Sequence, residues 1–186
     1  MDTDRFPLLV SLACHDLRTP LATVYGFART LSRGEELDDR SARFLGMIEE
    51  ASEQMTGMID EIGTAARIVG QRWEPALREV DTLELVRTDD ARVEVTGRGE
   101  MVETEAKVIS RGLHSLAVAA VRFGPVEQVT WRVDGPVLEL SPVTAAAAPV
   151  VTGEDVRDLG ALVARLAIEE LGGSVALDGE TLRVRL

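Results

Sequence analysis

The chain has 186 residues, 45% of them apolar, which is enough for one compact domain or for two small units. It carries 20 Lys and Arg residues against 32 Asp and Glu residues, and a net charge of −12 argues against wrapping of DNA or RNA, which needs clustered cations. The single cysteine, Cys14, excludes an internal disulfide and a cysteine-based zinc site. Because no apolar run is long enough to span a bilayer and no signal peptide pattern is present, we expect a cytoplasmic protein without a membrane segment or a separate sensing domain.

The first seventy residues predict two long amphipathic helices. Apolar residues recur every three or four positions from Phe6 to Leu31, and again from Phe44 to Ala65. Asp38 provides a candidate N-cap for the second helix. The short link predicts an antiparallel hairpin. Since neither helix can bury its apolar stripe against one partner alone, we expect two hairpins to form a homodimeric four-helix bundle.

The polar stretch Gly70–Glu79 predicts a boundary between a helical domain at residues 1–72 and a second domain at residues 76–186. In chain order, the pattern beyond it predicts a short helix over Leu83–Thr88, a strand over Ala91–Thr96, a long helix over Glu105–Phe123, strands over Val126–Val133 and Val137–Leu140, a loop over Pro142–Gly153, a helix over Glu154–Leu171, and two final strands. The dipeptides Asp134-Gly135 and Asp178-Gly179 predict the hairpin turns. Helices on one face of a mixed sheet make this half an α/β sandwich, and the whole chain α+β.

The clearest chemical feature is the run His15-Asp16-Leu17-Arg18-Thr19-Pro20-Leu21 in the first predicted helix. At about 100° per residue, His15 points away from the apolar stripe, so we expect its ring in solvent. Asp16 can accept a proton from one ring nitrogen and make the other a better nucleophile. Thr19 lies one turn further on, roughly on the same face.

This run resembles the H-box of bacterial two-component sensor histidine kinases, in their dimerisation and histidine-phosphotransfer domain. The continuation Ala22–Phe27 and the second helix, with Met58–Ile62, are similar to that family as well. The resemblance implies that His15 accepts the phosphoryl group and that Asp16 is the acid/base assisting transfer. It also implies that Thr19 positions water to dephosphorylate a response regulator.

The same resemblance implies the partners of the chain. Arg18, Ala22 and Tyr25 would lie on the docking surface for a receiver domain, and the hairpin would bind a second copy of itself. The expected partners are therefore response-regulator receiver domains and a homodimer, with no nucleic acid and no membrane.

The second half resembles in outline the Bergerat-type ATP-binding domain of the same family. Leu113–Phe123 is similar to its N-box helix, but the two N-box asparagines align with Ser115 and Ala119. Asparagine occurs nowhere in the chain, so no shift of register restores an amide oxygen for Mg²⁺.

The other nucleotide-binding features differ as well. Ser141–Thr144 stands where the family has an Asp-x-Gly-x-Gly box, and the ATP lid is reduced to the loop Pro142–Gly153. Asp158 replaces the glycine that opens the glycine-rich helix, and places a carboxylate where phosphates need backbone N–H groups. We therefore expect a degenerate domain that binds neither ATP nor Mg²⁺.

Three functions are compatible with the sequence. The favoured one is a histidine phosphotransferase, or pseudo-histidine kinase, that relays phosphoryl groups between receiver aspartates through His15 without using ATP. The second is a non-catalytic binding module that sequesters a response regulator or a kinase. The third is a response-regulator phosphatase that acts through Thr19.

Overall fold

The computed structural model describes residues 6–33 and 37–186, with the backbone alone at residues 8 and 9. The chain divides into two compact units, Met1–Arg72 and Trp73–Leu186. The division falls inside the polar stretch Gly70–Glu79.

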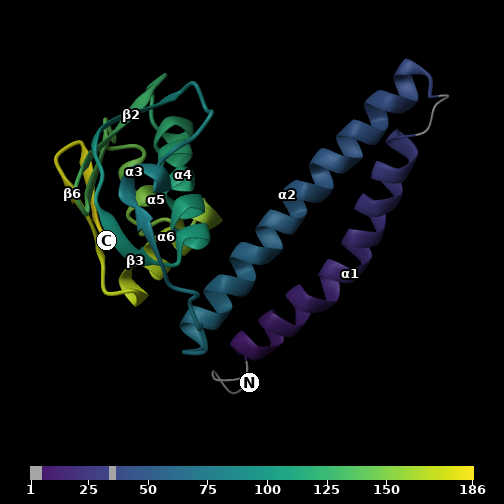
Figure 1. The fold of residues 1–186 in the computed structure, drawn as a ribbon, viewed down its shortest axis with the longest axis horizontal. Coiled ribbons are helices and arrows are strands. Elements are labelled where there is room, and N and C mark those ends of the chain that lie inside the picture. Colours follow the sequence, from purple (N-terminus) through teal and green to yellow (C-terminus); the bar gives the residue numbers. More distant parts are fainter. Residues whose placement is uncertain (1–5, 34–36) are drawn as a thin grey trace. The chain divides into compact units, whose positions relative to one another are not determined.

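The first unit is a helical hairpin, in which α1 (Phe6–Ser32) and α2 (Asp39–Val69) lie side by side and run antiparallel (Figure 1). Asp38 caps α2 as the sequence predicts, because its carboxylate accepts a hydrogen bond from the backbone N–H of Ser41 at 2.8 Å. The helix pair predicted from apolar spacing is therefore present.

Small side chains line the seam between the two helices. The buried residues of α1 recur every seven positions, at Pro7, Cys14, Leu21 and Ala28. Gly63 of α2 lies opposite, because a Cβ added there would be 3.8 Å from the Cβ of Cys14. Seven-residue spacing keeps one face of a helix against its neighbour, and small side chains let the two backbones approach closely.

A second apolar face of the hairpin stays exposed, and we call it the exposed apolar face. It consists of Phe6, Leu17, Val24, Phe27 and Leu31 from α1 with Phe44, Met47, Ile48, Met55, Met58, Ile62 and Val69 from α2. Each of these side chains is between 39% and 66% exposed. The predicted stripe is thus divided: Leu21 and Ala28 are buried in the seam, whereas most of its larger members are not buried within one hairpin.

The second unit is built on a five-stranded mixed sheet, as expected (Figure 1). Its strand order is β2 (Val93–Arg98), β4 (Val129–Asp134), β5 (Val137–Ser141), β7 (Thr181–Arg185) and β6 (Ser174–Asp178). β2 runs parallel to β4, and the other neighbours are antiparallel. The predicted hairpin turns lie between β4 and β5 and between β6 and β7.

Two short strands were not predicted from the sequence. β1 (Arg78–Asp81) and β3 (Met101–Thr104) form a separate antiparallel pair, beside the one-turn helix α3 (Thr82–Leu85). Each strand has only four residues, and neither REVD nor MVET shows the alternation of apolar and polar residues by which a strand is recognised in sequence.

The helices α4 (Ala106–Phe123) and α6 (Leu159–Glu170) cover one face of the large sheet (Figure 1). They approach closely at Gly112, where an added Cβ would lie 2.8 Å from the Cβ of Ala164. The fully buried side chains include Trp131, Leu138, Leu140 and Leu182 from the sheet, with Ile109, Leu113, Leu116 and Ile168 from the helices. The core of this unit therefore lies between the sheet and these two helices.

The prediction of one helix over Glu154–Leu171 was wrong at its start. α6 begins at Leu159, because Asp158 is extended and its carboxylate accepts a hydrogen bond from the backbone N–H of Ala161 at 3.0 Å.

The predicted loop Pro142–Gly153 also holds a short helix, α5 (Ala148–Val151), which has Pro149 in its first turn. This segment is not a surface loop: Val143, Ala147, Val150 and Val151 are at most 1% exposed. Their burial places α5 in the core, against α4 and α6.

Candidate functional site

His15 lies on the outer side of α1, with 77% of its side chain exposed. The preceding residue, Cys14, is buried in the seam with α2 and is only 4% exposed. Because neighbouring positions on a helix are about 100° apart, burial of Cys14 turns the imidazole of His15 into solvent. The ring is therefore accessible to a second protein.

Asp16 holds one nitrogen of that ring. Its Oδ1 lies 3.1 Å from Nδ1 of His15, and its own side chain is 68% exposed. Because a carboxylate accepts hydrogen bonds, this contact fits the tautomer in which Nδ1 carries the proton and Nε2 carries the lone pair. In that tautomer the lone pair of Nε2 is not used by Asp16 and is chemically suited to act as a nucleophile.

Thr19 is exposed one turn after His15, on the same side of α1. Its backbone carbonyl accepts a hydrogen bond from the hydroxyl of Thr23 at 3.1 Å. The structure thus brings His15, Asp16 and Thr19 together on two successive turns of one helix.

Two of the three predicted docking residues have partners on α2. Nε and Nη2 of Arg18 donate to Oδ1 of Asp60 at 3.2 and 2.8 Å. The hydroxyl of Tyr25 donates to Oε1 of Glu53 at 3.0 Å. Both side chains therefore join the two helices, a role that the sequence analysis missed.

A sequence signal for these pairs exists. Arg18 and Tyr25 are seven residues apart on α1, and Glu53 and Asp60 are seven apart on α2, in the order that an antiparallel pairing requires. The third predicted docking residue, Ala22, is exposed between the two pairs. A hollow of about 370 Å³ lies there, lined by Ala22, Tyr25, Glu53 and Thr56.

In the second unit, the positions aligned with the N-box asparagines carry no amide. Ala119 is fully buried and Ser115 is half-buried, both on α4. At the N-terminus of α6, the carboxylate of Asp158 accepts a hydrogen bond from the backbone N–H of Ala161. The chain itself therefore caps this helix end. Among the described residues, no three His, Cys, Asp or Glu side chains are grouped to hold a metal ion.

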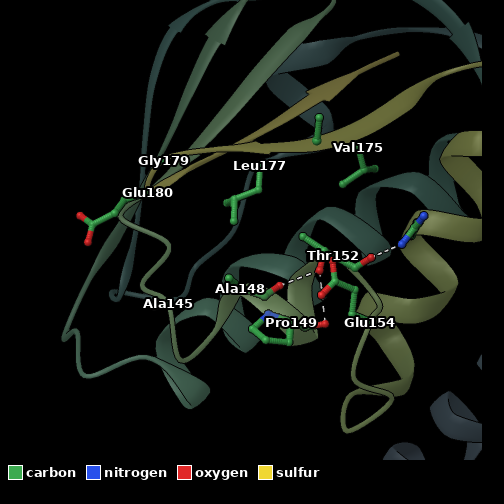
Figure 2. Close-up of a pocket in the computed structure, with 11 residues that line it drawn as sticks. Ala145, Ala148, Pro149, Thr152, Glu154, Val175, Leu177, Gly179 and Glu180 are labelled. Carbon is green, nitrogen blue, oxygen red and sulfur yellow. Dashed lines mark hydrogen bonds between the residues drawn. The ribbon is translucent and has the colours of Figure 1, made fainter.

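A hollow of about 590 Å³ lies between α5, α6 and the edge strand β6. Figure 2 shows Val175 and Leu177 directed from β6 toward α5, where Pro149 lies on the opposite wall. Arg165 also lines this hollow. Its guanidinium already donates hydrogen bonds to the carboxylate of Glu169 and to the backbone carbonyl of Thr152.

Comparisons with known proteins agree with this arrangement. The family model of the His Kinase A (phospho-acceptor) domain matches residues 8–70. Full-length ShkA, crystallised in complex with AMPPNP, superposes with a TM-score of 0.66 at 19% identity, over 96% of this chain and 44% of that one. The chain therefore spans less than half the length of ShkA. A comparison with curated proteins found no match.

Two further histidine kinases have a similar fold. AdeS of Acinetobacter baumannii gives a TM-score of 0.53 at 17% identity, over 92% of this chain and 96% of that one. The cytoplasmic segment of QseC gives a TM-score of 0.50 at 11% identity, over 73% of this chain and 92% of that one. At such identities the likeness establishes the fold.

The hairpin with its exposed histidine and the α/β unit have the fold of the histidine kinase core seen in ShkA and AdeS. Residues 8–70 belong to the His Kinase A (phospho-acceptor) domain family, and the second unit has the ATPase-like fold that follows this domain in histidine kinases. The resemblance and the fold class predicted from the sequence are confirmed. In the described parts of the chain, no helix is both long and apolar enough to cross a bilayer.

Proposed function

We propose that the chain is a histidine phosphotransferase that passes phosphoryl groups between receiver-domain aspartates through His15, in the cytoplasm and without using ATP. The observation that carries this proposal is the exposed side chain of His15, with Nδ1 held by Asp16. A histidine that is exposed and held in this way needs only a partner that carries the phosphoryl group.

The transfer step is a displacement at phosphorus. The lone pair on Nε2 of His15 attacks the phosphorus of a receiver's aspartyl phosphate, and a P–N bond forms as the P–O bond to the aspartate breaks. The aspartate leaves as a carboxylate with the bonding electron pair. Nδ1 keeps its proton, and Asp16 stabilises the positive charge that the ring gains. The reverse step delivers the phosphoryl group to the carboxylate of a second receiver.

The second unit supports the ATP-independent part of this proposal, because its residues do not fit magnesium-bound ATP. Mg²⁺ requires oxygen ligands in a near-octahedral arrangement, and the buried methyl group of Ala119 offers none. The carboxylate of Asp158 accepts from the backbone N–H of Ala161 and places a negative charge at the start of α6, where phosphate would otherwise bind. The segment in place of the lid is packed into the core as α5.

We further propose that the hairpin forms a homodimer through the exposed apolar face. Twelve large apolar side chains on one hairpin are more than isolated surface residues, and a patch of this kind marks an interaction site. A second copy presents the same apolar surface, and pairing them yields a four-helix bundle. His15 is 77% exposed on another side of α1 and stays accessible in that dimer.

Receiver docking is proposed at the hollow lined by Ala22 and Tyr25, which begins about two turns from His15. Tyr25 is fixed there by Glu53, so the wall of the hollow is ordered before a partner arrives. An ordered surface loses less side-chain entropy on binding.

The proposal is tested by transfer profiling with the full chain. Purified receiver domains from the same genome, phosphorylated with radiolabelled acetyl phosphate, are offered in turn. We expect acid-labile label on the chain, lost in His15→Ala and kept in His114→Ala, which removes the only other histidine. A receiver that binds but never transfers its label would support the binding module instead.

Two further outcomes would overturn parts of the proposal. Label on His15 after incubation with ATP and Mg²⁺ alone would refute ATP independence. Loss of phosphate from a receiver that persists in His15→Ala but disappears in Thr19→Ala would identify a phosphatase, and Thr19 would then be the functional side chain.

A further inference from the structure

The strand β6 forms one edge of the large sheet, since in the part of the chain that the structure describes it pairs with β7 alone. Edge strands are commonly protected against further pairing by charged side chains, proline or a bulge. The opposite edge strand, β2, has Glu94 and Arg98 together with Gly97, which has a positive φ of 104°. β6 has the sequence Ser-Val-Ala-Leu-Asp, in which only the last residue is charged, and its residues are exposed or half-buried. This edge is therefore open to pairing with another extended chain.

The register of the sheet shows which backbone groups of β6 are free. In an antiparallel pair, the N–H and C=O groups of successive residues point alternately to the two sides of a strand. Leu186, just after β7, donates from its backbone N–H to the carbonyl of Pro136 at 3.0 Å, so the even-numbered residues of β7 face β5. The odd-numbered residues of β7 face β6, where the register pairs them with even-numbered residues. The backbone groups of Val175 and Leu177 consequently point to the open edge.

The same two residues line the hollow of about 590 Å³ beside α5. Figure 2 shows Val175 and Leu177 directed toward the wall that holds Pro149, and both side chains are half-buried. When a strand is added to a sheet, the residues opposite Val175 and Leu177 direct their side chains to the same face. Side chains at every second position of an added strand would therefore enter the hollow. Free backbone groups next to a side-chain pocket are the two elements of recognition by strand addition.

The charges at the hollow indicate the kind of chain that fits it. Glu154 and Glu180 line the hollow and are exposed, and among the described residues neither carboxylate has an ion-pair partner. The basic residue of the lining, Arg165, is already paired with Glu169. A lysine or arginine of the bound chain would thus meet uncompensated negative charge. A second copy of β6 would not supply this cation, because β6 contains no basic residue.

We propose that β6 and the hollow beside it form a docking site for an extended segment of a partner protein, which adds a sixth strand to the five-stranded sheet. The segment directs apolar side chains at alternate positions into the hollow and carries a lysine or arginine near Glu154 or Glu180. Its backbone bonds to the free N–H and C=O groups of Val175 and Leu177. This inference concerns the second unit and does not depend on phosphotransfer through His15.

The probe is a set of fluorescein-labelled heptapeptides with valine, leucine or isoleucine at alternate positions, threonine between them and one lysine at either end. Binding to the full chain is followed by fluorescence anisotropy, and amide hydrogen exchange by NMR. We expect binding to slow the exchange of the amides of Val175 and Leu177, whereas the amide of Ala176, which is already paired with β7, changes little. N-methylation of one alternate set of peptide residues is expected to abolish binding, and methylation of the other set to preserve it.

Two comparisons of variants locate the site. Ala145 and Ala146 are neighbouring exposed residues, of which Ala145 lines the hollow and Ala146 does not. We expect Ala145→Phe to fill the hollow and to weaken peptide binding about tenfold, and Ala146→Phe to bind like the wild type. Glu154→Gln combined with Glu180→Gln is expected to lower the affinity roughly two- to fivefold at low salt. The control, Glu170→Gln, removes an exposed carboxylate of α6 outside the hollow and is expected to have no effect.

Three results would overturn this inference. The first is that none of the peptides binds, or that bound peptide leaves the amides of Val175 and Leu177 exchanging as in the free chain. The second is an equal affinity of Ala145→Phe and Ala146→Phe. The third is slow exchange at Val175 and Leu177 that appears at high protein concentration without peptide, because a second copy would then be the occupant. Labelling of His15 by a phosphorylated receiver is expected to be unchanged in Ala145→Phe, so the two functions are tested separately.

Discussion

The ion pair between Arg18 and Asp60 joins the turn of α1 that follows His15 to α2. Both hydrogen bonds end on Oδ1 of Asp60, at 3.2 and 2.8 Å, and the two side chains are 41% and 38% exposed. Replacing Arg18 by Gln or Asp60 by Asn removes one charge while keeping much of the side-chain volume. The two single variants and the double variant form a thermodynamic cycle.

The size of the coupling follows from distance and exposure. Two unit charges 2.8 Å apart attract by about 1.5 kcal/mol in water and by about 6 kcal/mol at an effective dielectric constant of about 20. Because both groups are more than a third exposed, solvent screening and the ordering of two long side chains bring the net value close to that of surface pairs, which is about 0.2–1 kcal/mol. The two hydrogen bonds to a charged acceptor favour the upper end. We expect a coupling energy of about 1 kcal/mol.

The assay is urea unfolding of the four proteins, followed by circular dichroism at one protein concentration, since self-association shifts apparent stability. The expected coupling decreases in 1 M NaCl, where the Debye length is about 3 Å. Arg29→Gln is the control, because Arg29 stacks on the ring of Tyr25 and its combination with Asp60→Asn is expected to be additive. A coupling below about 0.2 kcal/mol, or one that is unchanged in high salt, would refute the reasoning.

Two predictions concern the second unit. Asp158→Ala removes the N-cap of α6 and is expected to lower the free energy of unfolding by about 1 kcal/mol, measured by urea unfolding. Asp158→Asn retains a capping oxygen and is expected to keep most of the stability. Equal losses in the two variants would contradict a capping role for Asp158. Hydrogen bonds from Arg92 lower the pKa of Asp90 from 3.8 to about 2, so the stabilisation from this pair is present above about pH 4 and is lost as the pH falls through about 2. Arg92→Gln is therefore expected to return the NMR titration midpoint of the Asp90 carboxyl carbon toward 3.8, and a midpoint that stays near 2 would show that Arg92 is not the cause.

Local patterns in the amino-acid sequence determined much of this protein. The spacing of apolar residues is enough to predict two helices, and the dipeptides Asp134-Gly135 and Asp178-Gly179 are enough to predict two turns, because both depend on interactions within a few residues. The outward direction of His15 follows from the same helical period. The absence of asparagine is likewise a property of the sequence alone.

The tertiary structure decided what depends on residues far apart in the chain. The pairing of Arg18 with Asp60 joins positions 42 residues apart, and apolar periodicity carries no information about it. The two prolines and the glycine of the segment Pro142–Gly153 favour a loop in the sequence, and only the surrounding helices make this segment part of the core. The first residue of α6 was decided by the carboxylate of Asp158, which caps the helix. In the sequence the helical pattern of apolar and polar residues extends back to Glu154, so the pattern alone did not locate this start.

The apolar stripe of the hairpin depends on both the sequence and the tertiary structure. The sequence determined that α1 and α2 are amphipathic, since this depends on residue order along a single helix. Which apolar residues enter the seam was decided by the close approach of small side chains such as Cys14 and Ala28, and this left larger ones such as Val24 exposed. Helical periodicity fixes the direction of a side chain, whereas its burial depends on which neighbour the fold brings to that side.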